Sequence, residues 1–301
     1  MNNYFRSLKY FFVDTPPKIS SKFLSRKKGI LLTGQTTLSD SEQTAYAKYV
    51  EKVLQDDKLF SKFRKNYKYR QILDHVNYKQ GLEYLRKMEL YNINQDCYSE
   101  FIERSRGQGQ PIEYDYAGIG MVSPTTLRYL ATLEEIKYLF DLKPNPKIAE
   151  IGIGFAGQIA AFLEYLNPRQ ILTYDLPAVQ QLGGKYLELV ARPSDLAKLS
   201  HQDIHGIYST NVDLVVSNYA FSELPRKIQM EYIEKLFRRS SAGYLMMNSG
   251  RSNYTGRSEG KLTVDEILGH LPGAMVFEES PRTGPDNYLI IWGNARKPLT
   301  N

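Results

Sequence analysis

The stretch KIAEIGIGFAGQIAAFLEYLNPRQILTYD, residues 147–175, decides the fold. A short apolar run at 148–151 predicts a buried parallel strand, and glycines at 152, 154 and 157 follow it directly. Glycine suits this place because the backbone must turn sharply and leave its amides open to a ligand. Residues 158–166 then have the apolar spacing of a helix, which Asn167 and Pro168 end. A second strand over 170–174 leads to Asp175, so the unit is strand, tight turn, helix and strand.

Two acidic residues indicate which ligand this unit binds. Asp175 lies about 20 residues after the turn, where a carboxylate can accept hydrogen bonds from a ribose diol. Glu150 directly precedes the glycines, where it would repel the pyrophosphate of a dinucleotide but attract a cationic or zwitterionic tail. S-adenosylmethionine combines adenosine with such a tail. We therefore predict an S-adenosylmethionine site, whose residues on this stretch are Glu150, Gly152, Gly154, Gly157 and Asp175.

The segment EIGIGFAG (150–157) resembles motif I of the class I methyltransferases. The segments YDLPAVQQL (174–182), DLVVSNYAFSEL (213–224) and EESPRTGPDNYLIIWG (278–293) resemble the bacterial sugar O-methyltransferase family, and this similarity runs from about Ser123 to the C-terminus. The resemblance implies a Rossmann-like α/β fold, with a mostly parallel sheet and a closing antiparallel hairpin. It also implies methyl transfer to a hydroxyl of a sugar, nucleotide sugar or glycan. Ala156 departs from the motif, which has a third glycine there, and we expect its methyl group to narrow the approach to the cofactor.

The later strands supply the remaining candidate residues. Asp203 and Ile204 suit the tip of a third strand, where an acid can accept from an adenine amino group and an apolar side chain can pack on the ring. A buried strand over 211–218 ends at Asn218, an expected cofactor contact, because ligands of open α/β sheets bind at the carboxyl ends of strands. Just beyond it, Glu223 is the candidate general base. Tyr219, Ser222 and, in a polar loop, Arg251 are candidate acceptor-binding residues, with His201, His205 and His270 as alternative bases.

The segment before this domain divides into two parts, giving predicted domains 1–37, 38–122 and 123–301. Residues 38–122 read as a helical lid or dimerisation layer, opened by a capping box at Ser39 and Glu42, and a homo-oligomer is possible. Tyrosines that look exposed could stack on sugar rings or serve as packing; they are Tyr46, Tyr67, Tyr69, Tyr78, Tyr84 and Tyr91. The glycine-rich passage 107–123 is predicted to be a linker, whose residues 113–116 could close over the cofactor.

The excess of positive charge lies at the N-terminus. Of the net charge of +6, all comes from the first 30 residues, which hold seven basic residues and one acid. Aromatic and apolar residues recur there at helical spacing, so this arm could lie on an anionic membrane surface or dock on its own domain or on a sister subunit. The balanced remainder lacks the broad basic face that a nucleic acid needs.

Composition limits the other function classes. The one cysteine, Cys97, excludes an internal disulfide framework and a cysteine-rich zinc site and suits a reducing cytoplasm. No apolar run is long enough to span a membrane, and we expect neither a signal peptide nor a metal site. The alternatives left open are an NAD-dependent oxidoreductase, a non-catalytic methyltransferase-like scaffold, and methylation of another small molecule or of nucleic acid. The last is disfavoured because NYAF (218–221) does not match a base-flipping motif.

Overall fold

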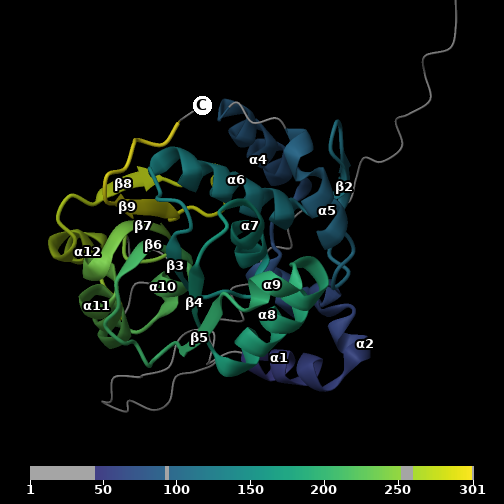
Figure 1. Ribbon diagram of the computed structural model, residues 1–301, viewed down its shortest axis with the longest axis horizontal. Coiled ribbons are helices and arrows are strands. Elements are labelled where there is room, and N and C mark those ends of the chain that lie inside the picture. Colours follow the sequence, from purple (N-terminus) through teal and green to yellow (C-terminus); the bar gives the residue numbers. More distant parts are fainter. Residues whose placement is uncertain (1–44, 92–94, 252–259, 300–301) are drawn as a thin grey trace, which may run out of the picture. The chain divides into compact units, whose positions relative to one another are not determined.

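The computed structural model describes residues 45–91, 95–251 and 260–299 (Figure 1). The basic arm, the capping box expected at residues 39 and 42, and residues 252–259 of the polar loop lie outside the described residues. The helices are α1 (Ala45–Gln55), α2 (Asp57–Phe60), α3 (Tyr67–Leu73), α4 (Tyr78–Leu90), α5 (Ser99–Ser105), α6 (Pro124–Leu139), α7 (Gly157–Tyr165), α8 (Pro177–Val190), α9 (Pro193–Leu196), α10 (Ala220–Glu223), α11 (Arg226–Lys235) and α12 (Val264–His270). The strands are β1 (Tyr114–Tyr116), β2 (Gly120–Val122), β3 (Lys147–Ile151), β4 (Gln170–Asp175), β5 (Leu199–Asp203), β6 (Val212–Asn218), β7 (Ser240–Met247), β8 (Met275–Glu278) and β9 (Tyr288–Trp292).

Seven of the nine described strands form one sheet in the order β5-β4-β3-β6-β7-β9-β8. The first five of these are parallel, and β9 runs antiparallel to both β7 and β8. The β3 strand is central: Ile148 is in register with Ile171 of β4 and with Leu214 of β6. This confirms the predicted mostly parallel sheet with a closing antiparallel hairpin. The hairpin is antiparallel because the connection between β8 and β9 is too short for a crossover helix.

Side chains of the sheet alternate between two apolar layers. Ile148 and Ile171 face a layer that also contains residues of α1, α4, α6, α7 and α8. Their neighbours Ala149 and Leu172 face a second layer, formed with α10, α11 and α12. In Figure 1, α6 and α7 accordingly lie on a different side of the sheet from α11 and α12. Strands covered on both faces read as continuous apolar runs, which is why β3 and β6 were recognisable in the sequence.

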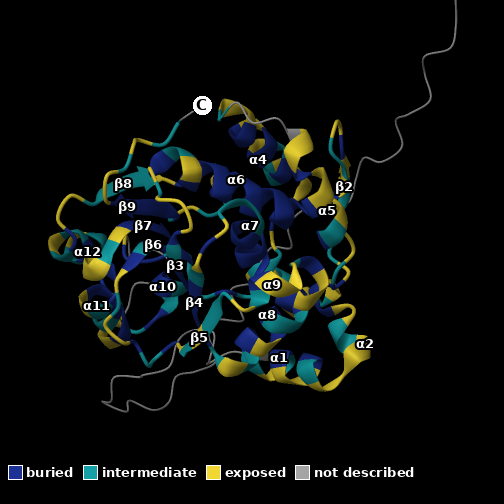
Figure 2. Ribbon diagram, in the orientation of Figure 1, coloured by how far each residue is buried: buried dark blue, intermediate teal, exposed yellow. Residues whose placement is uncertain are grey.

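The N-terminal helices pack directly on the helices of the sheet. Helix α4 lies against α6 and α1 against α8, and all of α6 except Lys137 and Tyr138 is buried (Figure 2). The expectation of exposed tyrosines in this layer is wrong at three positions. Tyr46, Tyr69 and Tyr84 are buried in the shared core, where the helices leave little room for water.

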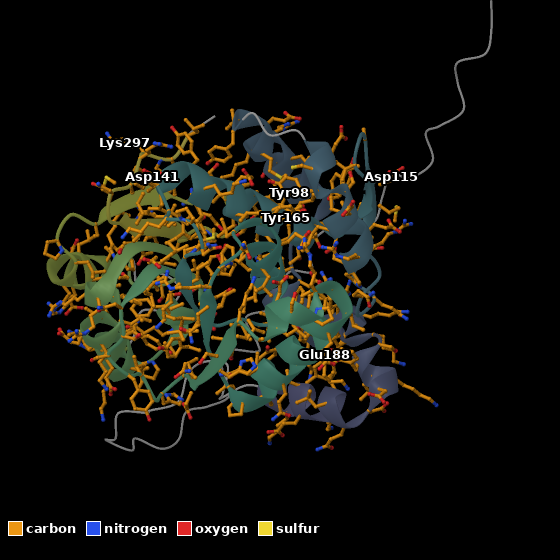
Figure 3. The ribbon with its side chains drawn as sticks, viewed as in Figure 1. Tyr98, Asp115, Asp141, Tyr165, Glu188 and Lys297 are labelled. Atoms are coloured by element: carbon orange, nitrogen blue, oxygen red, sulfur yellow. The ribbon has the colours of Figure 1, made fainter. Side chains whose placement is uncertain are left out.

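A polar and aromatic contact joins α5 to the sheet's helices. Tyr98, which precedes α5, meets the ring of Tyr165 of α7 edge to face with centroids 4.9 Å apart (Figure 3). The Tyr98 hydroxyl donates to Glu134 of α6, and the Tyr165 hydroxyl donates to the carbonyl of Cys97 at 3.3 Å. Such pairs add specificity to the apolar packing and hold the layer in one orientation.

The glycine-rich passage 107–123 is more than the linker predicted from its composition. It contains the antiparallel hairpin of β1 and β2, in which Tyr116 is fully buried. The Tyr116 ring stacks on Tyr78 with centroids 5.0 Å apart, and its hydroxyl donates to the carbonyl of Tyr78 at 3.2 Å. A Cβ atom at Gly81 of α4 would lie 2.0 Å from the Tyr116 hydroxyl. The missing side chain at position 81 thus makes room for the hairpin.

Candidate functional site

A cavity of about 560 Å³ opens at the carboxyl ends of the central strands. Its sheet side is lined by residues at the ends of β4 and β6 and just after β3 and β7, among them Gly152, Asp175, Asn218 and Asn248. Its opposite side is lined by residues of α1, α3 and α6 and by the connection between β8 and β9 (283–287). The N-terminal layer, which the sequence predicts to be a lid or a dimerisation layer, therefore supplies part of the wall.

The turn after β3 brings backbone to the cavity where a side chain would not fit. Gly152 has φ +77° and Gly154 has φ +54°, a region that non-glycine residues rarely adopt. A Cβ atom at Gly152 would lie 1.9 Å from the Cβ of Ala220, and one at Gly154 would lie 3.3 Å from Leu73. Both glycines line the cavity, so this pair occupies the place predicted for it. A side chain at either glycine would occupy space that the turn leaves open beside the backbone.

The third glycine and its neighbour have a packing role instead. Gly157 opens α7 and is not among the lining residues; a Cβ atom there would lie 2.3 Å from the Tyr129 ring. Ala156 has φ +66° and is fully buried. Its methyl group does not line the cavity, so the expected narrowing of the approach is wrong. The backbone at Ala156 is strained, because an L-residue adopts the left-handed conformation only at a cost in free energy.

Asp175 is held rigidly at the cavity wall by backbone amides. Its Oδ2 accepts from the amide of Gly154 at 3.2 Å, and its Oδ1 accepts from the amide of Leu176 at 2.7 Å. Burial raises the pKa of Asp175 to about 7, although these amide hydrogen bonds favour the ionised form. The carboxyl group at the tip of β4 therefore lies where the sequence predicts it, with an unusually high proton affinity.

Glu150 differs from its prediction. Its side chain is buried beneath the turn, does not line the cavity, and its Oε2 has no hydrogen-bond partner among the described residues. Burial, followed by the charge of Asp175, raises the pKa of Glu150 well above its ordinary value. The raised pKa favours the uncharged form of Glu150 and so weakens the ionic attraction that we expected it to exert on a cationic tail. The choice of ligand therefore rests on the other residues of the site.

The pair at the tip of β5 is divided between two environments. Ile204 is buried and lines the cavity, as expected of a residue that packs on an adenine ring. Asp203 is exposed and lies outside the lining; its Oδ1 accepts from the amide of His205 at 2.7 Å. The adenine-binding role predicted for Asp203 is not supported by this position.

The segment after β6 carries the reactive candidates. Asn218, Tyr219 and Glu223 all line the cavity, and Asn218 Oδ1 is buried without a hydrogen-bond partner among the described residues. Tyr219 has φ +73°, a strained conformation for a bulky residue, and such strain is concentrated at functional sites. Glu223 Oε1 accepts from Nδ2 of Asn248 at 3.4 Å. The amide of Asn248 thus helps to orient the predicted base.

Two of the predicted acceptor-binding residues do not line the cavity. Ser222 is fully buried, and its Oγ lies 2.6 Å from the carbonyl of Tyr219 and 2.7 Å from Oδ1 of Asn248, so it fastens α10 to the loop after β7. Arg251 is exposed, forms an ion pair with Glu278 at 2.7 Å, and lies over the Tyr288 ring with 5.3 Å between its Cζ and the ring centroid. Both side chains already have protein partners. The acceptor-binding role expected for them is not supported by their positions.

Of the four histidines, only His75 lines the cavity. His201, His205 and His270, the alternative bases, lie elsewhere; His201 Nδ1 is 2.7 Å from the Thr173 hydroxyl, for example. The surrounding protein and the nearby Arg128 cation lower the pKa of His75, so its imidazole is neutral at pH 7 even though its side chain opens to the cavity.

The wall opposite the sheet contains Tyr46, Leu73, His75 and Arg128. The sequence singled out Tyr46, as one of the tyrosines that could stack on sugar rings, but no motif in residues 38–128 marks the other three. Within the described ranges, no group of three or more His, Cys, Asp or Glu residues is placed to hold a metal ion. In the same ranges no helix is both long and apolar enough to cross a bilayer.

Comparisons with known proteins add a partial likeness of fold. No family model and no curated protein matches the chain. The methyltransferase domain of bacterial CtHen1 is 14% identical with a TM-score of 0.41, over 55% of this chain and 96% of that one. The O-methyltransferase family 2 protein of Planctomyces limnophilus, in complex with apigenin, is 12% identical with a TM-score of 0.40, over 55% and 58% of the two chains. PigF with SAH is 11% identical with a TM-score of 0.36, over 50% and 51%. With scores this low, these likenesses do not indicate a function.

Proposed function

We propose that this protein is an S-adenosylmethionine-dependent methyltransferase. One observation carries the proposal: the glycine turn after β3, the carboxyl group of Asp175 after β4 and the carboxyl group of Glu223 after β6 line a single cavity. They do so at the carboxyl edge of a sheet that closes with an antiparallel hairpin, as the class I methyltransferase resemblance implies. A dinucleotide oxidoreductase with a second mononucleotide half would continue the parallel sheet instead.

The lining residues divide into a cofactor side and an acceptor side. The glycine turn at 152–154 lets the amino-acid tail approach the backbone closely, Asp175 accepts from the ribose hydroxyls, and Ile204 packs on the adenine. When bound, the cofactor supplies a methyl group that is already electrophilic. The protein's own task is then to align the acceptor oxygen and to remove its proton.

Glu223 is the proposed general base. It lies at the C-terminal end of α10, lines the cavity, is half-buried, and is oriented by the Asn248 amide. A hydroxyl is a weak nucleophile while it keeps its proton, so a carboxylate within hydrogen-bond reach of it accelerates the transfer. The other acid that lines the cavity, Asp175, is already engaged by backbone amides.

The acceptor we propose is a sugar, nucleotide sugar or glycan. Its part of the cavity is lined by Tyr219, Asn248, Thr283 and Asn287, whose side chains also hydrogen-bond within the protein. Rings that stack on a pyranose face and side chains that hydrogen-bond its hydroxyls are the usual means of binding sugars. Support for this finer assignment comes from the sequence resemblance and from this lining.

Calorimetric titration tests the cofactor. The wild type and Asp175→Ala would each be titrated with S-adenosylmethionine, S-adenosylhomocysteine and NAD. We expect the first two ligands to bind the wild type and to bind the variant at least tenfold more weakly, since a buried acceptor for the ribose is lost. Binding of NAD alone would identify an oxidoreductase. Binding of none of the three ligands would favour the non-catalytic methyltransferase-like scaffold.

The base is tested by Glu223→Gln, which keeps the side chain's shape and removes its basicity. We expect turnover with a sugar acceptor to fall by about 10²–10⁴-fold. The affinity for S-adenosylhomocysteine should stay within about threefold, because Glu223 is assigned no cofactor contact. Turnover would be measured as methyl transfer to a panel of nucleotide sugars and free sugars. Normal turnover by this variant would remove Glu223 from the mechanism.

A further inference from the structure

Arg128 presents a positive charge to the cavity from the side opposite the sheet. It belongs to the first turns of α6, lines the cavity, and is 6% exposed. A guanidinium group remains protonated in proteins and carries five N–H donors. Yet its Nη1 has no hydrogen-bond partner among the described residues, and no carboxylate there forms an ion pair with it.

The other buried cations of the described chain are compensated. Arg64 is fully buried and forms a two-pronged ion pair with Asp74, with Nε to Oδ2 at 2.9 Å and Nη2 to Oδ1 at 3.0 Å. Lys87 is 5% exposed and pairs with Glu135 at 2.8 Å. Buried charges are ordinarily paired, because an uncompensated charge away from water is strongly unfavourable. Arg128 departs from this rule at a cavity wall.

The groups around Arg128 do not neutralise it. Its Cζ lies 5.3 Å from the centroid of the Tyr129 ring, and the Tyr129 side chain also hydrogen-bonds the guanidinium, but a tyrosine with a raised pKa brings no negative charge. The neighbouring imidazole of His75 is neutral, and Asp74 is already engaged by Arg64. Glu279, across the cavity wall, accepts hydrogen bonds from Tyr219, from the amide of Thr283 and from Asn287. Asp74 and Glu279 thus have their hydrogen-bond partners elsewhere.

We propose that Arg128 is the binding residue for a carboxylate or phosphate group of a molecule that enters the cavity. An oxyanion would accept from the unpartnered Nη1 and restore charge balance at a buried guanidinium. Two molecules can bring such a group, namely the amino-acid tail of the cofactor and an acidic acceptor such as a sugar acid or sugar phosphate. Only this choice of molecule rests on the proposed methyltransferase function; the anion site itself does not.

The anion site is tested without any cofactor. Inorganic phosphate would be titrated into the wild type, into Arg128→Gln, and into Arg106→Gln, whose native arginine is exposed and pairs with Glu103. We expect phosphate to raise the thermal midpoint of the wild type and of Arg106→Gln but not of Arg128→Gln. An equal rise in all three proteins, or no rise in the wild type, would overturn the proposal.

A second pair of ligands identifies the source of the anion. S-adenosylhomocysteine carries the amino-acid tail, and 5′-methylthioadenosine lacks it. If the tail supplies the carboxylate, Arg128→Gln should weaken the first ligand at least tenfold and leave the second unchanged. If both affinities are unchanged, the acceptor supplies it, and glucuronate or glucose 6-phosphate should bind the wild type saturated with S-adenosylhomocysteine at least tenfold more tightly than Arg128→Gln. If the wild type binds neither adenosine ligand, the methyltransferase function is contradicted. The phosphate titration still tests the anion site, because it involves no cofactor.

A matched pair of substitutions tests whether Arg128 lacks an ionic partner within the protein. Arg128→Met removes the charge and breaks no ion pair, whereas Arg64→Met leaves Asp74 buried without its partner. Without ligand, we expect the thermal midpoint of Arg128→Met to equal or exceed that of the wild type, and the midpoint of Arg64→Met to fall. An equal fall in both variants would show that Arg128 already has a partner in the protein, and would overturn the proposal.

Discussion

At the scale of single residues, Asp175 combines two opposing requirements. It must be ionised to accept two hydrogen bonds from a ribose, yet its place at the base of the cavity raises its pKa to about 7. The amides of Gly154 and Leu176 fix its orientation before any ligand arrives. A preorganised acceptor of this kind reduces the entropy lost on binding. Its proton affinity makes binding depend on pH near neutrality.

The sign of this pH dependence follows from linkage. A ribose donates to the ionised carboxylate, so ligand binding competes with the proton on Asp175. We expect affinity for 5′-methylthioadenosine, which has no titrating tail, to be about tenfold weaker at pH 6 than at pH 8, and to level off above the pKa of about 7. Calorimetry across this pH range measures it. Asp175→Asn should bind weakly at every pH; a wild type with a flat profile would mean that Asp175 does not titrate on binding.

Residue order along the chain predicts which loop reaches the site but not which side chain faces it. Of the neighbours Asp203 and Ile204, the second lines the cavity; of Ser222 and Glu223, again the second does. Successive residues at strand ends and in short helices point in different directions, so a shift of one position exchanges a ligand contact for an internal hydrogen bond. Such orientation is set by packing from other parts of the chain.

At the scale of elements, the hairpin of β1 and β2 shows how the N-terminal layer is assembled. Tyr116 fills the space that Gly81 leaves on the surface of α4. Composition alone indicated a linker for the passage 107–123, because glycine is common both in linkers and in the turns of a hairpin. The contact between the hairpin and α4 depends on tertiary structure, because the two elements are separate in the sequence.

This contact predicts that two helical glycines respond oppositely to alanine. A Cβ atom at Gly184 of α8 would meet nothing within 4 Å. Gly184→Ala should therefore stabilise the protein by about 0.5–1 kcal/mol, since alanine favours the helix. Gly81→Ala should destabilise it by about 1–3 kcal/mol, because the fully buried Tyr116 must move. Denaturant unfolding of both variants measures this; equal stabilisation by both would show that the hairpin does not dock at Gly81.

At the scale of the whole described chain, the helical layer and the sheet form one folding unit. A single apolar cluster includes Val50 of α1, Tyr84 of α4, Leu130 of α6 and Ile148 of β3. The ion pair of Arg64 with Asp74 is extended by a hydrogen bond from Arg64 Nη2 to the Ser123 hydroxyl at 3.0 Å, which joins the layer to the start of α6. The predicted boundary at 122/123 thus crosses a continuous core.

Expression of residues 123–301 alone tests this continuity. Each large apolar side chain that returns to water costs roughly 1.5–3 kcal/mol, and removal of α1 and α4 exposes many of them on α6 and α8. We expect this fragment to show no cooperative thermal transition, while residues 38–301 keep one. Circular dichroism on heating distinguishes the two. A fragment that melts at the midpoint of the longer protein would make residues 123–301 an independent domain.

The mostly parallel sheet and the position of the glycine turn were predictable from local features of the chain. Runs such as those of β3 and β6 and the requirement for glycine at 152 and 154 are local properties, because they depend on backbone conformation and on burial from both faces. Tertiary structure alone decided the opposite wall of the cavity, where His75 and Arg128 come from helices far from the motif. It also decided that Glu150 is buried, which raises the pKa of its carboxyl group. These properties depend on which groups surround a side chain, and distant segments of the chain supply those groups.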